Sequence, residues 1–485
     1  MKIHNSIIIL ALVLLLFSCQ KKQEIHWVYS DSLSKFKDKS LAPSLVILDQ
    51  LPKGEIQYSL DTKKTLQTLE GFGACLNEMG WDVLKTLPTQ MKDSIMKEFF
   101  DKEKGLRLSY IRMPIGANDY SLDWYSHNES DQDYEMINFN ISRDKQYLIP
   151  YIQEAKKYNN DVKIWASPWC PPSWMKKNKH YACRKSENND LDAKKQGAEN
   201  TNQFQMDEKT LKAYSLYFEK FLKAYKQEGI DIYAVHVQNE PNSCQDFPCC
   251  VWTSAGLNEF IGKYLGPGLS QSCPNTEIWL GTIERPSFEK VDSILKDQES
   301  SKYIKGVGFQ WAGKDAIPEV HKQYPNMKKM ETESECGNGS NDWAAAFHTF
   351  DLINHYLSNG ANVYMYWNLI LDETGKSRWG WKQNSLVSVE RKSGKVQFNP
   401  EFYLFKQICQ FVENNAKMVE VMKSTEKDCI AFLNPNGDLV ILMANKNEVP
   451  KSYNLKINNK FLSITMKPKS INTIILAKNG LDKTL

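Results

Sequence analysis

The sequence has no large excess of charge of either sign. Its 61 Lys and Arg residues are nearly balanced by 58 Asp and Glu residues, which gives a net charge of +3 over 485 residues. The lysines are scattered along the chain and do not mass in one segment. Nucleic-acid binding requires a concentrated basic patch, so this composition argues against a nucleic-acid partner.

Motifs for metals and dinucleotides are also absent. None of the 11 cysteines has the Cys-x-x-Cys spacing of a structural zinc site. No glycine-rich phosphate turn follows the first predicted strand, and Gly71-Phe72-Gly73 lies within that strand. We therefore expect no metal and no organic cofactor.

Long apolar runs are scarce. The run over residues 7–17 is too short to anchor the chain across a bilayer. Preceded by Lys2 and closed by Leu16-Phe17-Ser18-Cys19, it predicts a signal peptide over residues 1–19. This segment resembles a bacterial lipoprotein signal, with lipid attached to Cys19 and a polar tether from residue 20; a plain secretory signal is the alternative. We expect an exported protein that is anchored to the bacterial cell envelope, at the outer membrane or the periplasmic face. The lipid on Cys19 would be its only contact with the membrane.

Export would allow the remaining cysteines to form disulfides. Cys244, Cys249 and Cys250 form one group, and Cys170 and Cys183 flank another predicted loop. Pairing within either group is compatible with the sequence, but the connectivity cannot be derived from it.

The length indicates one large domain with a smaller companion. Over residues 66–413, predicted strands alternate with helices, and the clearest helix spans 207–228. Eight strand-helix units close a (β/α)8 barrel with parallel strands, and an open doubly wound sheet is the alternative. The eight predicted strands lie at 68–76, 105–116, 161–169, 229–240, 276–283, 303–311, 326–333 and 361–371.

The pattern changes after residue 413. Residues 414–485 contain five or six short alternating apolar runs, with a turn signal at Asn436-Gly437. We expect a small antiparallel β-sandwich here, completed by strands from residues 20–65.

The fourth barrel strand leads to a carboxylate. Apolar residues crowd the segment 230–237, and the run stops at Gln238-Asn239-Glu240-Pro241, because proline cannot continue the hydrogen-bond ladder. Strand ends at this rim carry the chemistry of such barrels. Glu240 is therefore a candidate catalytic residue.

A second group of carboxylates follows the seventh strand. Glu331, Glu333 and Glu335 alternate, so in an extended strand they would share one face. We expect a solvated position for Glu331 and a functional one for Glu333, with Glu335 as the alternative. Two carboxyl groups facing each other across the barrel mouth suit glycoside hydrolysis, in which one donates a proton and the other attacks the anomeric carbon.

Six motifs occur in order along the chain: EGFGACLNE (70–78), RLSYIRMPIGANDYS (107–121), IWASPWCPPSWMK (164–176), VQNEPN (237–242), TESECG (332–337) and YWNL (366–369). Together they resemble glycoside hydrolase family 30, the glucosylceramidase-like and endo-β-1,6-glucanase-like enzymes.

The resemblance implies that Glu240 is the acid/base and Glu333 the nucleophile of a retaining β-glycosidase. Asn239 would bind the sugar 2-hydroxyl, and Arg112 would orient the nucleophile and keep it ionised. Asp119 and Trp169 would line the sugar pocket, with Trp367 as an aromatic floor.

One departure bears on the substrate. The sequence has Gln310-Trp311 where glucosylceramidases of the family carry histidine and tyrosine, and the loop after Glu240 also differs. We expect a carbohydrate substrate, β-1,6-glucan, with Trp311 stacking on a further sugar. The alternatives are a glucosylceramidase, a xylan- or fucoside-active relative, and a glycan-binding lipoprotein without catalysis.

Overall fold

The computed structural model describes residues 25–40, 45–48, 50, 52–422 and 427–478. The expected signal peptide, the lipid-bearing Cys19 and the start of the tether lie outside these residues, so the anchor stays a prediction. Among the described residues, no helix combines the length and the apolar character that crossing a bilayer requires.

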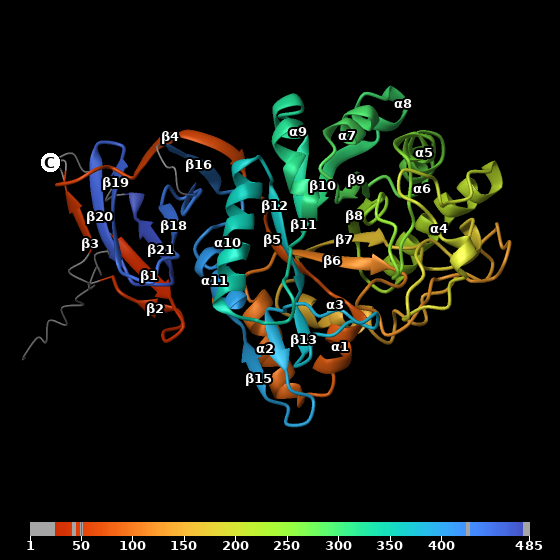
Figure 1. Cartoon of the computed structure of the whole chain (residues 1–485), viewed down its shortest axis with the longest axis horizontal. Helices are drawn as coiled ribbons and strands as arrows, with labels where there is room; N and C mark the ends of the chain where they lie inside the picture. Colours follow the sequence, from red (N-terminus) through yellow and green to blue (C-terminus); the bar gives the residue numbers. More distant parts are fainter. Residues whose placement is uncertain (1–24, 41–44, 49, 51, 423–426, 479–485) are drawn as a thin grey trace, which may run out of the picture.

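Eight parallel strands close into a barrel, as the strand-helix alternation predicted. Most of their residues are buried, because neighbouring strands cover the edges and helices cover the outer face (Figure 1). The barrel strands are β5 (Gly71–Cys75), β6 (Tyr110–Ile115), β7 (Lys163–Pro168), β8 (Ile232–His236), β9 (Glu277–Ile283), β10 (Ile304–Gln310), β11 (Lys328–Glu333) and β12 (Val363–Asn368).

Helix α4 (Glu208–Gln227) illustrates how the helices are specified. The Asp207 side chain accepts a hydrogen bond from Thr210 N and caps the first turn, and Gly229, at φ 75°, ends the helix. The other helices are α1 (Glu78–Leu84), α2 (Thr89–Phe100), α3 (Leu148–Lys156), α5 (Ser254–Phe260), α6 (Gly266–Ser272), α7 (Phe288–Leu295), α8 (Gln298–Ser301), α9 (Ile317–Gln323), α10 (Trp343–Ser358) and α11 (Pro400–Cys409).

The barrel interior is filled with side chains. Tyr110, Trp165, Trp279, Met330 and Met365 come from five of the barrel strands and belong to one buried cluster. The barrel is therefore a packed core and no pore, so a substrate has access only to the rim.

The last barrel strand is shorter than expected. The predicted strand over 361–371 divides into β12, which ends at Asn368, and β13 (Ile370–Asp372), which pairs with β14 (Val387–Val389) in a separate sheet completed by β15 (Val396–Phe398). The Asn368 side chain bonds to Asn77 and Gln383 at this point, which redirects the chain.

The smaller domain joins strands from both parts of the chain, and it flanks the barrel on the left of Figure 1. The amino-terminal strands take part, as expected: β1 pairs antiparallel with β21 from Ile25↔Leu476 to Ser30↔Ile471. One pair, β4 with β19, is parallel. The strands are β1 (Ile25–Ser30), β2 (Lys37–Asp38), β3 (Leu45–Leu48), β4 (Tyr58–Thr68), β16 (Lys417–Met422), β17 (Cys429–Leu433), β18 (Leu439–Asn445), β19 (Lys451–Ile457), β20 (Lys460–Met466) and β21 (Ser470–Leu476).

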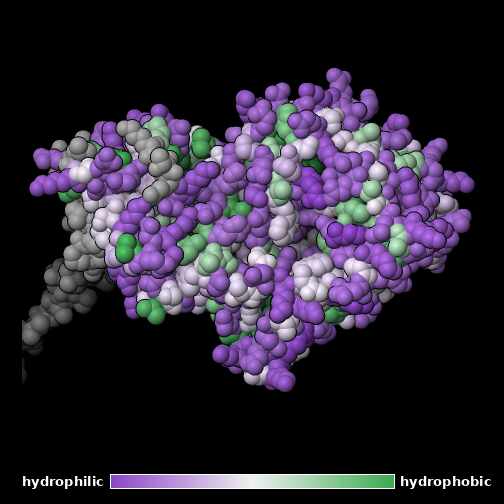
Figure 2. Space-filling model, in the orientation of Figure 1, coloured by the Kyte–Doolittle hydropathy of each residue, from purple (hydrophilic) through white to green (hydrophobic). Residues whose placement is uncertain are grey.

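Hydrophilic residues dominate the face in Figure 2, and hydrophobic ones are scattered over both domains. Large apolar side chains are instead gathered in the two domain cores, as in an ordinary water-exposed globular protein.

Trp27 ties the amino-terminal strand into the sandwich core, where it is 1% exposed and its Nε1 donates to Asn472 Oδ1 at 3.1 Å. We expect Trp27→Ala to lower the free energy of unfolding by about 3–5 kcal/mol, because it leaves a cavity and an unpaired amide. Urea denaturation followed by circular dichroism measures this loss. Trp27→Phe should lose less, and equal losses for both variants would contradict the packing argument.

Candidate active site

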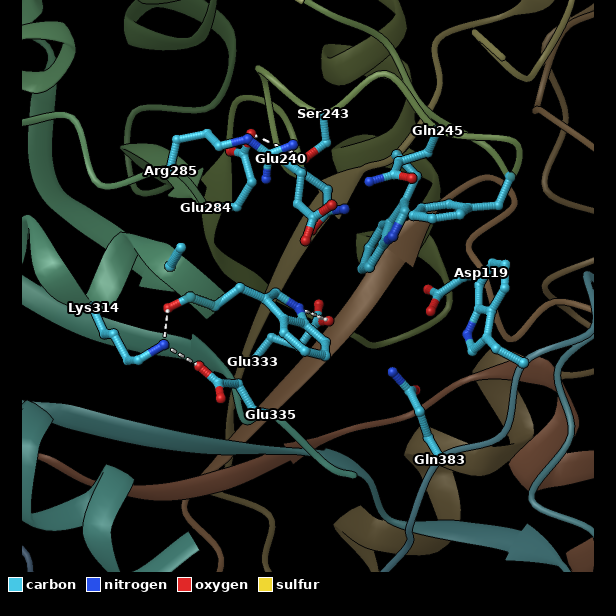
Figure 3. Close-up of a pocket in the computed structure, with 16 residues that line it drawn as sticks. Asp119, Glu240, Ser243, Gln245, Glu284, Arg285, Lys314, Glu333, Glu335 and Gln383 are labelled. Atoms are coloured by element: carbon cyan, nitrogen blue, oxygen red, sulfur yellow. Dashed lines mark hydrogen bonds and ion pairs between the residues drawn. The ribbon is translucent and has the colours of Figure 1, made fainter. Parts of the chain in front are cut away.

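Two glutamates from opposite parts of the barrel converge over its rim (Figure 3). Glu333 is the last residue of β11, and Glu240 follows β8 by four residues. The amide nitrogen of Gln310 lies 3.0 Å from Glu240 Oε1 and 3.1 Å from Glu333 Oε2. Two oxygens that share one partner in this way are at most about 6 Å apart, close enough to act on one bond.

The segment after β8 is held by its neighbours on both sides. Asn239 N donates to Pro168 O of β7 at 2.8 Å, and Glu240 N donates to Thr282 O of β9 at 3.2 Å. Glu240 has φ 47°, a left-handed conformation that is costly for a residue with a side chain. Trp311, which lines the same cavity, also has φ 47°. Strain of this kind persists where the surrounding contacts enforce it, and it is concentrated at functional sites.

Arg112 on β6 links Glu333 to Asn239, the residue that precedes Glu240. Its Nη1 donates to Glu333 Oε2 at 2.8 Å, and its Nη2 donates to Asn239 Oδ1 at 2.6 Å. The guanidinium is fully buried and lies 4.4 Å from the centre of the Trp169 ring. A planar cation with forked donors can satisfy both partners at once, which lysine could not do.

The environment of the two carboxyl groups differs. Burial raises the pKa of Glu240 well above its usual range, and the charge of Glu333 raises it further. Burial also raises the pKa of Glu333, but Arg112 and hydrogen bonds from Trp311 and Gln310 oppose this rise. Glu240 therefore holds its proton more tightly than Glu333 does, and Glu333 ionises more readily.

Asp119 and Asn239 offer polar groups to the cavity that they line. Asp119 is buried, and its Oδ1 has no hydrogen-bond partner within the described residues. The Asn239 oxygen accepts from Arg112 and from Thr282 Oγ1, which leaves its amide nitrogen as a donor. A sugar hydroxyl could pair with each of them.

The three predicted tryptophans occupy different places. Trp169 lines the cavity, whereas Trp367 is fully buried beneath it, with ring centres 5.6 Å apart. Trp367 therefore supports Trp169 and does not itself touch a ligand. Trp311 also lines the cavity, but its Nε1 donates to Glu333 Oε1 at 2.9 Å, a contact that the expected stacking role did not include.

The three glutamates of the seventh strand do not share one face. Glu331 is fully buried, contrary to the solvated position expected, and its Oε2 accepts from Met365 N at 2.8 Å. Glu335 lies beyond the end of β11 and pairs with Lys314 at 2.6 Å and with His348 at 3.1 Å. Burial would raise the pKa of Glu335, but these two partners lower it. Glu335 leaves the alternation because β11 ends at Glu333.

Several cavity residues escaped the sequence analysis. The cavity has a volume of about 530 Å³. Figure 3 shows charged side chains on one side of the glutamate pair and Asp119 with Gln383 on the other. Glu284-Arg285 and Ala312 had a sequence signal, because they directly follow the fifth and the sixth predicted strands. The missed residues are Ser243, Gln245, Phe247, Glu284, Arg285, Ala312, Lys314, Trp381 and Gln383.

The described cysteines form no disulfide among themselves. Cys183 packs with Cys249 and Cys244, across the two groups that the sequence suggested. Within the described part of the chain, no group of three or more His, Cys, Asp or Glu side chains is arranged to hold a metal ion.

A closed parallel barrel with two carboxyl groups over its carboxyl rim is an architecture of glycoside hydrolases. The family comparison agrees: the glycosyl hydrolase family 30 TIM-barrel domain matches residues 69–412, and the family's beta-sandwich domain matches residues 415–474. The chain belongs to glycosyl hydrolase family 30 and is a glycoside hydrolase.

The similar proteins include some named as glucosylceramidases and others named as endo-1,6-beta-glucanases. The chain is 32% identical over 422 residues to "Putative glucosylceramidase 1" of Caenorhabditis elegans, covering 82% of this chain and 77% of that protein. It is 26% identical over 396 residues to an endo-1,6-beta-D-glucanase of Trichoderma harzianum, covering 78% of each. The crystal structure of SrfJ from Salmonella typhimurium has the same fold, with a TM-score of 0.83 at 20% identity over 93% of this chain and 99% of that one.

We expect Arg112→Met to lower the free energy of unfolding by about 3–5 kcal/mol, because it leaves the buried Glu333 without its cation and removes one donor from Asn239. Adding Glu333→Gln should recover part of this loss by removing the uncompensated charge. Arg378→Met is the control, since Arg378 pairs with Asp123 at the surface at 3.7 Å, and it should cost less than about 1 kcal/mol. Urea denaturation measures all three, and equal losses for the two arginine variants would contradict the proposed role of Arg112.

Proposed function

We propose that the chain is a retaining β-glycosidase, with Glu333 as the nucleophile and Glu240 as the acid/base. The observation that carries this proposal is the Gln310 amide bonded to both carboxyl groups. The resulting limit of about 6 Å between the two oxygens is compatible with the roughly 5–5.5 Å separation of the carboxyl groups in retaining enzymes.

The proposed reaction has two steps. Glu333 attacks the anomeric carbon while Glu240 protonates the leaving oxygen, which gives a glycosyl ester on Glu333 and a free alcohol. Glu240, now ionised, takes a proton from water as the water attacks the same carbon and releases Glu333. The different surroundings of the two carboxyl groups suit these roles, since the acid must begin protonated and the nucleophile ionised.

Asn239, Asp119, Trp169 and Trp311 are the proposed sugar contacts. Asn239 has a free donor for the 2-hydroxyl, and Asp119 has a free acceptor for another hydroxyl of the same sugar. Trp169 provides a ring for the sugar face. Arg112 and Trp367 lie beneath these contacts and act through Glu333 and Trp169.

We further propose β-linked glucose in a polysaccharide, β-1,6-glucan, as the substrate. The side of the cavity next to Glu240 carries Glu284 and Arg285, and Lys314 lines the cavity beside Glu335. Such charged groups suit the hydroxyls of a leaving sugar and offer little to the alkyl chains of a lipid. The Trichoderma harzianum relative, named as an endo-1,6-beta-D-glucanase, supports this assignment.

A glucosylceramidase is the second candidate. The observation in its favour is the 32% identity to the Caenorhabditis elegans protein, which exceeds the 26% identity to the glucanase. Both candidates use the same two glutamates and differ only in the leaving group.

A substrate panel separates the two. Purified enzyme is incubated with β-1,6-glucan, β-1,3-glucan, xylan and glucosylceramide, and products are followed by NMR. We expect oligosaccharides or glucose from β-1,6-glucan, with the β-anomer appearing first. An α-anomer would contradict retention, and turnover of glucosylceramide alone would favour the second candidate. No hydrolysis of any of the four substrates, or of an aryl β-glucoside tested beside them, would favour a binding protein.

The two glutamates should respond differently to substitution. We expect Glu333→Gln to abolish turnover of every glucoside. Glu240→Gln should slow substrates with poor leaving groups by about 10²–10⁴-fold and activated aryl glucosides far less, because only the former need the acid. Steady-state kinetics on both classes of substrate measures this difference, and equal losses would contradict the acid role.

The matched control for the nucleophile is Glu335→Gln, two residues along the chain, which should keep measurable turnover. An activated 2-fluoroglucoside should label Glu333 in the wild-type enzyme, as read by peptide mass spectrometry. Labelling of Glu335 would reassign the nucleophile.

A further inference from the structure

A third carboxyl group lies beside the acid/base. Glu284 follows β9 directly, lines the cavity and is only 1% exposed. Figure 3 shows it next to Glu240 and Ser243. The proposed two-step reaction requires only Glu240 and Glu333, so a buried carboxyl group at this position calls for a separate explanation.

Glu284 holds the turn that carries Glu240. Its Oε1 accepts a hydrogen bond from Asn242 N at 3.0 Å and from the Ser243 hydroxyl at 3.1 Å. Within the same turn, Ser243 N donates to Glu240 O at 3.0 Å. Because Glu240 occupies a left-handed conformation, its position depends on contacts of this kind on both sides.

We propose that Glu284 is a positioning residue for Glu240: it fixes the turn after Glu240 and places a negative charge beside the acid, which keeps Glu240 protonated. This inference rests on the proposed role of Glu240 as the acid/base. It assigns to Glu284 both a geometric and an electrostatic effect, and the two can be separated by experiment.

The charges around the pair come from several elements. Arg285 stands beside Glu284 and is bonded to Glu199 at 2.6 Å, and Lys290 on α7 also interacts with Glu284. Glu333 and Asp119 face Glu240 from the other side. Glu284 therefore has two nearby cations, while Glu240 is surrounded mainly by anions.

These surroundings set the order in which the groups ionise. Burial raises the pKa of Glu284 to about 7, and Arg285 opposes this rise. Burial raises the pKa of Glu240 further, and the charges of Glu333 and Glu284 add to it. Removing the charge of Glu284 should therefore lower the pKa of Glu240, so that Glu240 loses its proton at a lower pH.

The test is the pH profile of kcat/KM for Glu284→Gln, which keeps an oxygen to accept from Asn242 and Ser243 but removes the charge. With a glucoside that has a poor leaving group, the alkaline limb should move to lower pH by at least about 0.5 unit. With an activated aryl glucoside, whose cleavage depends little on the acid, the limb should move less. A purely structural defect would lower both profiles without shifting one limb selectively.

Two further variants separate charge from geometry. Ser243→Ala removes one hydrogen bond to Glu284 and keeps the charge, so its alkaline limb should coincide with that of the wild type. Glu284→Asp also keeps the charge but shortens its reach, so it should lower kcat and shift the limb less than Glu284→Gln does. It remains informative if Glu284→Gln fails to fold.

Three outcomes would overturn the inference: an unshifted limb in Glu284→Gln, the same shift with both leaving groups, or an equal shift in Glu284→Asp. Absence of turnover in the wild-type enzyme would instead contradict the proposed function. The two failures are therefore distinguishable.

Discussion

The buried pair of Arg112 and Glu333 is the interaction on which the site depends. A guanidinium and a carboxylate with at most 5% exposure are costly to bury, and such a pair persists only when hydrogen bonds satisfy most of its polar atoms. Arg112 donates to Thr332 O and Asn239 in addition to Glu333, and only its Nε has no hydrogen-bond partner among the described residues. The same contacts therefore fix Glu333 and Asn239, the residue beside Glu240. The hydrogen bonds that compensate the buried charges also set the geometry of the site.

The packed barrel beneath the pair gives this arrangement its rigidity. Arg112 lies 5.0 Å from the centre of the Trp165 ring, and Trp165 belongs to the layer of large side chains that fills the interior. Close-packed cores deform little, so they can hold strained residues such as Glu240 and Trp311 at the rim. The packed layer in the barrel interior therefore supports the strained residues at the rim.

The sequence predicted the barrel well because buried parallel strands and amphipathic helices have strong periodic patterns. It also placed Glu333 at the end of a strand, where the structure has it, and Glu240 at the end of another, although β8 ends four residues earlier at His236. It could not place Phe247 and Trp381, whose rings lie 4.9 Å apart although they come from loops 134 positions apart in the chain. Loop positions follow from tertiary contacts and leave no local pattern. The single face expected for Glu331, Glu333 and Glu335 was also wrong. Glu331 is buried, and Glu335 lies beyond the end of β11, where alternation no longer holds.

The pairing of β1 with β21 has a consequence for biosynthesis. The first strand of the sandwich emerges from the ribosome long before its partner, which lies more than 400 residues further along the chain. At roughly 5–20 residues per second, the edge of β1 stays without β21 for tens of seconds. The sandwich can therefore close only after every strand of the barrel has been synthesised.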